Sequence, residues 1–132
     1  MYSCDCDTTP ISFAVPTSLR AYAPDEADAA AICPRCLRVE PVADTDTTDD
    51  VAFDRLSSSF PTGEAGVALA LAIGLCASLA TNRSALEDAL EAVERAGADP
   101  LLALDRLLAE PSVEPAIDLE RRRHQLEQLL YG

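Results

Sequence analysis

Lysine is absent from this 132-residue chain, and all ten of its positively charged residues are arginines. Together, 23 aspartates and glutamates leave a formal net charge of −13. An acidic surface without lysine keeps a protein hydrated in molar salt, where charge repulsion is screened to a Debye length of about 3 Å. The composition therefore predicts a protein of a halophile. It argues against nucleic acid as the default partner, because phosphate binding needs a local excess of positive charge.

Histidine and glycine are scarce, and both scarcities bear on catalysis. Because His124 is the single histidine, Ser-His-Asp or Cys-His catalysis would depend on it alone, and no nucleophile stands near it at helical spacing. Among the five glycines, Gly63 and Gly66 lack the Lys and Ser/Thr that follow in a phosphate-binding loop. We therefore expect a protein that is not an enzyme.

A leader peptide is also missing from the start of the sequence. Residues 1–7 are polar and acidic, with neither a basic nor an apolar region, which predicts a cytoplasmic protein. In that reducing compartment, closely spaced cysteines indicate a metal site or a redox pair before they indicate a disulfide. A hydrophobic content of 48% predicts that most of the chain folds.

The composition changes twice along the chain and predicts three parts. Residues 1–42 hold four of the five cysteines and two strand candidates, at 11–15 and from 29–32 through 37–39. A helical turn within 24–31 is an open alternative. Residues 43–50 form an acidic, low-complexity linker, and residues 51–132 switch to alanine and leucine at helical spacing.

Four helices are predicted in the last part, with a weaker one at 51–59. Their spans are 62–80, 84–97 with a capping box at Ser84, 99–110 with Asp99 as N-cap, and 115–131. The first is apolar all round, so it must be surrounded, and its many small residues favour a buried helix over a membrane span. We therefore predict an α+β, mainly α fold: a small N-terminal zinc ribbon of short strands and an antiparallel bundle of about four helices.

Two cysteine pairs supply the motif with the clearest chemistry. The thiolates of Cys33 and Cys36, three positions apart across a tight turn, can reach one tetrahedral zinc ion. With Cys4 and Cys6 they make four sulfur ligands, and Asp7 is an alternative to one thiolate of the first pair. We predict one structural Zn²⁺; a thiol redox pair, an iron site and cysteines without metal are the other possibilities. Cys76, in the middle of a helix, is predicted to be a small buried hydrophobic residue.

A single basic cluster occurs near the C-terminus, formed by Arg121, Arg122, Arg123 and His124. It is a candidate patch for binding an acidic partner or phosphate. The competing interpretation, which we favour, is pairing within the helix, because acids stand four positions away from these residues in Asp118–Arg122, Arg123–Glu127 and Glu120–His124.

Several short stretches resemble a family of small uncharacterised zinc-finger-like proteins of haloarchaea, which is a domain of unknown function. The stretches are Phe13-Ala14-Val15-Pro16 with Leu19-Arg20 and Tyr22, Cys33-Pro34-Arg35-Cys36-Leu37, Phe60-Pro61-x-Gly63-Glu64-Ala65, Leu104-Asp105-Arg106-Leu107, and Arg122 to Leu130. The family pattern has C-x-x-C at the N-terminus, whereas this chain has C-x-C. The resemblance implies a zinc site and assigns no activity.

The leading hypothesis is a zinc-binding, non-enzymatic interaction or adaptor protein whose partner is another protein. The alternatives are a nucleic-acid-binding, transcription-associated ribbon and a thiol-based redox regulator at Cys33 and Cys36. No membrane is expected as a partner. A homodimer through the helical bundle is also considered, along the edge of the last helix formed by Leu126, Leu129 and Leu130.

Overall fold

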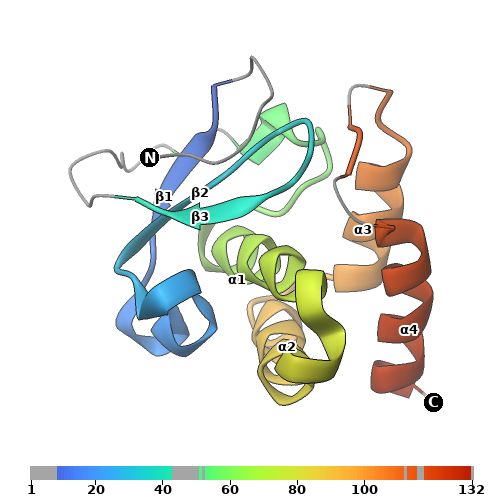
Figure 1. Cartoon of the computed structure of the whole chain (residues 1–132). Coiled ribbons are helices and arrows are strands. Elements are labelled where there is room, and N and C mark those ends of the chain that lie inside the picture. The colour runs from blue at the N-terminus through green and yellow to red at the C-terminus, as the bar shows by residue number, and fades with distance from the viewer. Residues whose placement is uncertain (1–8, 43–50, 52, 112, 116–117, 132) are drawn as a thin grey trace.

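The computed structural model describes residues 9–42, 51, 53–111, 113–115 and 118–131 (Figure 1). Three strands, β1 (Ile11–Ala14), β2 (Ala29–Ile32) and β3 (Val39–Pro41), precede the α-helices α1 (Gly63–Leu75), α2 (Leu79–Arg95), α3 (Pro100–Leu108) and α4 (Leu119–Tyr131). Short 3-10 helices connect them: η1 (Thr17–Tyr22), η2 (Pro24–Glu26), η4 (Phe53–Arg55) and η5 (Cys76–Ser78). The fold is α+β and mainly helical, as the sequence predicts.

The three strands form one antiparallel sheet in the order β1-β2-β3. Ile11 pairs with Ile32 across the first two strands, and Ile32 pairs with Val39 across the second pair. The alternating apolar residues of β1 produce alternating burial, whereas the central strand β2 is buried throughout. Both strand predictions are confirmed. The helical alternative for 24–31 is realised only as η2, after which the chain becomes extended.

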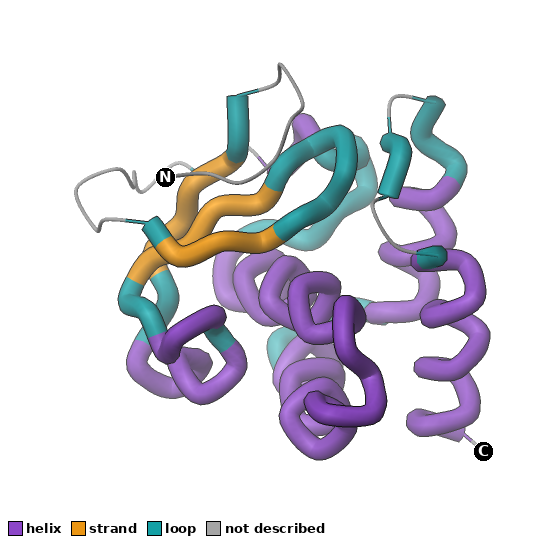
Figure 2. Tube along the Cα trace, in the orientation of Figure 1, coloured by secondary structure: helices purple, strands orange, loops and turns teal. Residues whose placement is uncertain are grey.

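Helix α1 lies at the centre of the molecule because it is apolar on every side. All nine residues from Ala65 to Ile73 are buried, between the sheet on one side and α2 on the other (Figure 2). Gly74 allows the closest approach to the sheet, since a Cβ there would stand 2.9 Å from the Cβ of Val39. The expectation of a surrounded helix is confirmed. None of the helices in the described part of the chain is both long enough and apolar enough to cross a bilayer.

The boundary between the first two helices differs from the prediction. Helix α1 ends at Leu75 rather than near residue 80, and α2 begins at Leu79, so Ser84 lies exposed inside α2 and starts no helix. A side-chain cap forms at this boundary: the Nδ2 of Asn82, seven residues after Leu75, donates to the carbonyl oxygen of Leu75 at 3.2 Å. That bond satisfies one of the orphan acceptors where α1 stops.

The remaining helix ends largely follow their capping residues. Helix α2 ends at Arg95, two residues before Gly97, whose positive φ of 95° favours glycine. The Oδ1 of Asp99 accepts N–H bonds from Leu101 and Leu102, each at 3.1 Å, as predicted for the N-cap of α3. Helix α4 begins at Leu119, later than the predicted residue 115. The weaker helix expected at 51–59 is reduced to η4.

One apolar core joins the strands to the helices. Its aromatic centre contains Phe13 from β1, Phe53 from η4 and Phe60, with the Phe53 ring 5.7 Å from that of Phe13 and 5.4 Å from that of Phe60. Residues from both sides of 43–50 therefore share a core. The 43–50 segment lies outside the described residues, and the division into parts 1–42, 43–50 and 51–132 stays a prediction.

Candidate metal centre

A tight turn between β2 and β3 carries the C-x-x-C motif. The N–H of Leu37 donates to the carbonyl oxygen of Cys33, and the N–H of Cys33 donates to that of Arg38, both at 3.0 Å. Leu37 has a φ of +64°, the left-handed conformation that reverses the chain. The turn, which contains both cysteines, therefore joins β2 and β3 at one end of the sheet.

The sulfur of Cys33 receives two backbone N–H groups from within the turn. The N–H groups of Arg35 and Cys36 lie 3.4 and 3.5 Å from its Sγ. Cys33 is fully buried and Cys36 is half-buried. Two N–H groups directed at one sulfur hydrogen-bond it and hold its orientation, as the outer hydrogen-bond donors of a metal-bound cysteine do. The donor set of this turn therefore fits a thiophilic metal such as zinc.

The other predicted ligands, Cys4 and Cys6, and the alternative Asp7 lie outside the described residues. The strand register is favourable for them, because the pairing of Ile11 with Ile32 places the start of β1 beside the end of β2, which leads into Cys33. Cys6 stands three positions before Thr9, so an extended chain spans at most about 10 Å between them. In the described ranges alone, no three metal-ligating side chains gather at one point.

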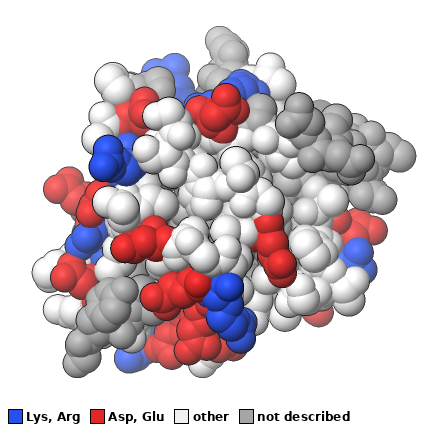
Figure 3. Space-filling model, turned by 180° about the vertical axis from the view of Figure 1, so that it is seen from behind, with Lys and Arg blue, Asp and Glu red and all other residues white. Residues whose placement is uncertain are grey.

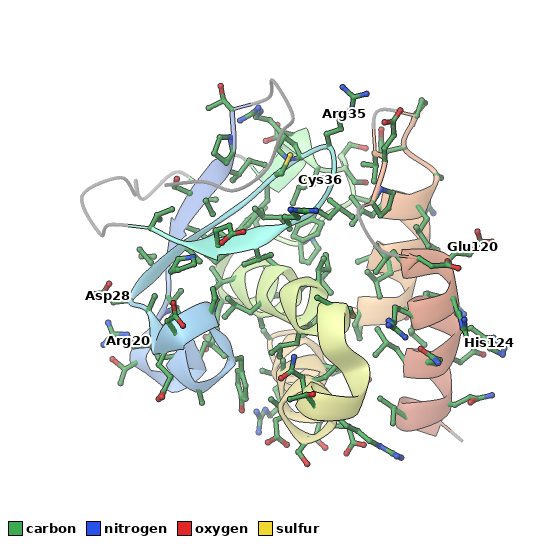
Figure 4. All side chains as sticks on the ribbon, viewed as in Figure 1. Arg20, Asp28, Arg35, Cys36, Glu120 and His124 are labelled. Atoms are coloured by element: carbon green, nitrogen blue, oxygen red, sulfur yellow. The ribbon has the colours of Figure 1, made fainter. Side chains whose placement is uncertain are left out.

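A residue from the far end of the sequence holds the cysteine turn. The N–H of Glu114, in the connection between α3 and α4, donates to the carbonyl oxygen of Arg35 at 2.6 Å. The guanidinium of Arg35 in turn donates to the Oε2 of Glu114, from Nη2 at 3.0 Å and from Nε at 3.3 Å. Figure 4 shows Arg35 at the tip of the hairpin, beside this connection.

A hollow of about 300 Å³ opens next to the turn. It lies between the β2–β3 hairpin, the end of α1 and the start of α4, and its walls include Cys36, Val39, Ile73, Gly74, Pro115 and Leu119. The charged residues Arg38 and Glu40 also line it. The hollow therefore combines apolar walls with charged groups, as binding sites usually do.

The four residues of the basic cluster on α4 fall into two groups, one facing the body of the protein and one exposed. Arg122 and Arg123 face the body of the protein: Nε of Arg122 donates to the carbonyl oxygen of Cys76 at 3.0 Å, and Nε of Arg123 lies 2.8 Å from Asp105. Arg123 also pairs with Glu127, as predicted. The hydrogen bond to Asp105 raises the pKa of Arg123, so this group stays charged.

The other two members of the cluster, Arg121 and His124, are exposed. Their side chains have no hydrogen bond or ion pair to any of the described residues, and His124 points away from the body of the protein, as does Glu120 (Figure 4). The expected Glu120–His124 pair is thus not formed in this part of the chain. Arg122 contacts Gln125 and the Cys76 carbonyl with its side chain instead of Asp118.

Cys76 is buried at the junction of α1 and α2, as predicted. Burial raises the pKa of its thiol to about 12, although the nearby charge of Arg122 acts in the opposite direction. A thiol with that pKa stays protonated at neutral pH and is a poor nucleophile and metal ligand.

Two contacts at the ends of the hairpin and of α1 join residues far apart in the sequence. Glu114 lies 79 residues from Arg35, and Arg122 lies 46 residues from the Cys76 carbonyl that it caps. No local pattern relates residues so far apart, so a single sequence carries no signal for either contact.

Comparisons with known proteins identify a family without identifying an activity. A model described as "Family of unknown function (DUF6276)" matches residues 3–130. No curated protein and no solved structure matches the chain. The likeness to a domain of unknown function is thus confirmed, and no ligand or activity comes with it.

Proposed function

The chain belongs to this family of unknown function, DUF6276, and we propose that it is a non-enzymatic interaction protein stabilised by one structural zinc ion. In this proposal Cys33 and Cys36 hold the ion together with Cys4 and Cys6, as in a zinc ribbon. The zinc would polarise no substrate; it would tie the N-terminal segment to the β2–β3 hairpin.

The observation that carries the proposal is the pair of N–H groups directed at the Cys33 sulfur. Such donors are typical of cysteine sulfurs that ligate a metal, because they hydrogen-bond the ligand from its outer side and hold it in position. Structural zinc contributes on the order of 10 kcal/mol of coupled folding free energy in small metal-binding domains. That contribution would stabilise a sheet of only three short strands at the end that carries the cysteine turn.

The surroundings of the turn favour structural metal over redox chemistry. A reactive cysteine usually stands at the N-terminus of a helix, where the helix dipole stabilises its thiolate. Cys33 instead follows strand β2, and the turn leads into strand β3. Cys33 is also fully buried, so its sulfur is hindered from attacking a disulfide of another molecule.

A protein partner fits the surface better than nucleic acid does. On the face shown in Figure 3, arginines lie singly or in small groups among acidic side chains. At the turn, Arg35 is paired with Glu114. At the opposite end of the sheet, the Nε of Arg20 donates to the Val15 carbonyl oxygen (Figure 4). The apolar hollow beside Cys36 is of a size to accept a partner side chain. We place this protein in the cytoplasm of a halophilic archaeon, where its charge of −13 keeps it hydrated.

Metal content with thiol counting, on native protein purified in molar salt, tests the proposal. We expect one zinc per chain and four thiols protected from alkylation at neutral pH by the metal. Cys33→Ser should lose the zinc and expose the remaining three of these thiols together. Cys76→Ala is the matched control, because it removes a buried cysteine far from the turn and should keep the zinc.

Two results would contradict the proposal. Metal-free protein with a rapidly alkylated or oxidised Cys33–Cys36 pair would make thiol chemistry the better hypothesis. Bound iron with a visible thiolate charge-transfer band would replace zinc by a redox centre.

A separate measurement tests the proposed protein partner. Binding to DNA or RNA that falls steeply with salt would favour the nucleic-acid alternative.

A further inference from the structure

We propose that Glu114 is a positioning residue for the metal centre, which it controls through Arg35. The inference rests on the proposed zinc site and adds a residue that lies 78 positions beyond Cys36. Its basis is the three hydrogen bonds between Glu114 and Arg35, the residue directly before Cys36.

One peptide group links Glu114 to the sulfur of Cys33. The carbonyl of Arg35 and the N–H of Cys36 belong to the same planar unit, so orienting one end orients the other. Glu114 donates its N–H to that carbonyl at 2.6 Å, while the Cys36 N–H is directed at the Cys33 Sγ at 3.5 Å. A chain of hydrogen bonds therefore runs from Glu114 through the peptide to the sulfur, and each bond polarises the next.

The side chains of the same two residues form a second contact, in which Arg35 is the donor and Glu114 is the acceptor. The carboxylate of Glu114 accepts two N–H bonds from the Arg35 guanidinium, at 3.0 and 3.3 Å. The pair holds the Glu114 backbone against the turn and neutralises a cation that sits between the two proposed ligands. Loss of the carboxylate removes these two bonds and leaves the backbone bond from the Glu114 N–H to the Arg35 carbonyl oxygen.

The pair is exposed, so its effect should be moderate and sensitive to salt. The side chain of Arg35 is 51% exposed and that of Glu114 is 67% exposed. Exposed ion pairs contribute little to global stability, and salt screens them. Hydrogen-bonded outer partners of metal ligands, in contrast, typically change metal affinity by about 10- to 100-fold. We therefore expect an effect on metal retention near the lower end of that range.

The test measures the rate at which full-length, zinc-loaded protein transfers zinc to a colorimetric chelator. At about 0.2 M salt, Glu114→Ala should release zinc about 10-fold faster than the unmodified chain. Glu120→Ala is the matched control, because it removes the same charge from the exposed face of α4 and should stay within about twofold. In molar salt the difference between Glu114→Ala and the unmodified chain should shrink.

A charge swap separates positioning from a general loss of stability. Arg35→Glu alone places two carboxylates together and should accelerate zinc release, whereas Arg35→Glu combined with Glu114→Arg should restore most of the original rate. Circular dichroism should show that all variants unfold at similar temperatures in the metal-free state. A role in stability alone would shift those temperatures and leave the release rate at low temperature unchanged.

The outcomes distinguish the two proposals. If the unmodified chain holds zinc but Glu114→Ala releases it at the original rate, the inference about Glu114 fails while the zinc site stands. If the unmodified chain holds no zinc, the proposed function fails and the inference falls with it.

Discussion

At the scale of single residues, Cys76 shows how burial couples a protonation state to folding. Its thiol is 1% exposed at the junction of α1 and α2, where desolvation raises its pKa from 9.0 to about 12. Above pH 9 the unfolded chain loses this proton while the folded chain keeps it. The contribution of Cys76 to stability is therefore complete below pH 9 and decreases as the pH rises toward 12.

The change that tests this coupling is Cys76→Ala. Between pH 9 and 11 the unmodified protein should lose on the order of 1 kcal/mol more per pH unit than the variant, because only it carries the shifted thiol. Urea unfolding at several pH values measures the difference. The ionisation of the other cysteines and the tyrosines cancels in the comparison. Parallel pH profiles for the two proteins would contradict the assigned pKa.

Leu37 combines two opposing effects in the cysteine turn. Its φ of +64° is unfavourable for a residue with a Cβ, at a cost of about 1 kcal/mol, yet its side chain is only 5% exposed and contributes to the core. Burying a leucine is worth about 1.5–3 kcal/mol, which exceeds that strain. This balance explains why leucine is tolerated at a position that suits glycine.

Two substitutions at residue 37 separate the strain from the burial. Both Leu37→Ala and Leu37→Gly remove the buried side chain, but only glycine relieves the positive φ. We expect Leu37→Gly to be the more stable variant by about 1 kcal/mol, the reverse of the usual order in regular structure. Urea unfolding at matched metal content measures both. Greater stability of the alanine variant would show that the turn relaxes out of the left-handed conformation.

At the scale of elements, the packing of α1 against the sheet depends on Gly74. Alanine is the better helix former by about 1 kcal/mol, so propensity alone predicts that Gly74→Ala stabilises the protein. Its Cβ, however, would stand 2.9 Å from the Cβ of Val39 on β3. Overpacking of this kind costs about 1–3 kcal/mol, which exceeds the gain in propensity.

We therefore expect Gly74→Ala to lower the free energy of unfolding by about 1 kcal/mol, with the loss measured by urea unfolding. Combining it with Val39→Ala removes two methyl groups from the contact and should recover part of the loss relative to Val39→Ala alone. A stabilising effect of the single change would mean that α1 and β3 are farther apart than described.

At the scale of the whole molecule, net charge dominates over individual ion pairs. The chain carries 23 acids against 10 arginines, and the four ion pairs that join described residues all involve side chains that are at least 25% exposed. Added salt weakens such pairs, but it also screens the repulsion among the excess acids, and the second effect involves more charges.

Stability should therefore increase between 0.1 and 1 M KCl, as the Debye length falls from about 10 to about 3 Å. The comparison variant replaces Asp88, Glu91 and Glu94 of α2 by their amides, which removes three negative charges at largely exposed positions. Its gain in urea midpoint with salt should be smaller than that of the unmodified chain. Equal gains would assign the salt effect to hydrophobic burial instead of charge screening.

Prediction from sequence succeeded where structure depends on near neighbours. The alternation at Ile11 marked β1, Gly97 marked the end of α2, and Asp99 marked the start of α3. It failed at the junction of α1 and α2, where the Ser84 capping box predicted a helix start, whereas the cap at the end of α1 comes from Asn82, seven residues after Leu75. The capping-box pattern relates residues only three positions apart and does not include this contact.

The candidate site, too, was predictable only where its contacts are local in sequence. Spacing alone predicted that Cys33 and Cys36 share a turn, because a C-x-x-C pair is local. The closing contact between Arg35 and Glu114 was not predictable, since the two are 79 residues apart. The sequence likewise found the basic cluster on α4 without separating inward-facing Arg122 and Arg123 from exposed Arg121 and His124.

The mainly helical α+β class, the position of the strands, the central place of α1 and the cysteine turn were all predictable from the sequence. Each follows from hydrophobic period, capping residues or motif spacing, which act over a few residues. Two features required the folded structure: the strands and helices share one core, and Glu114, distant in sequence, holds the turn. Both features depend on which distant segments of the chain come together when apolar surface is buried. The close packing of the whole molecule sets the distances between those segments.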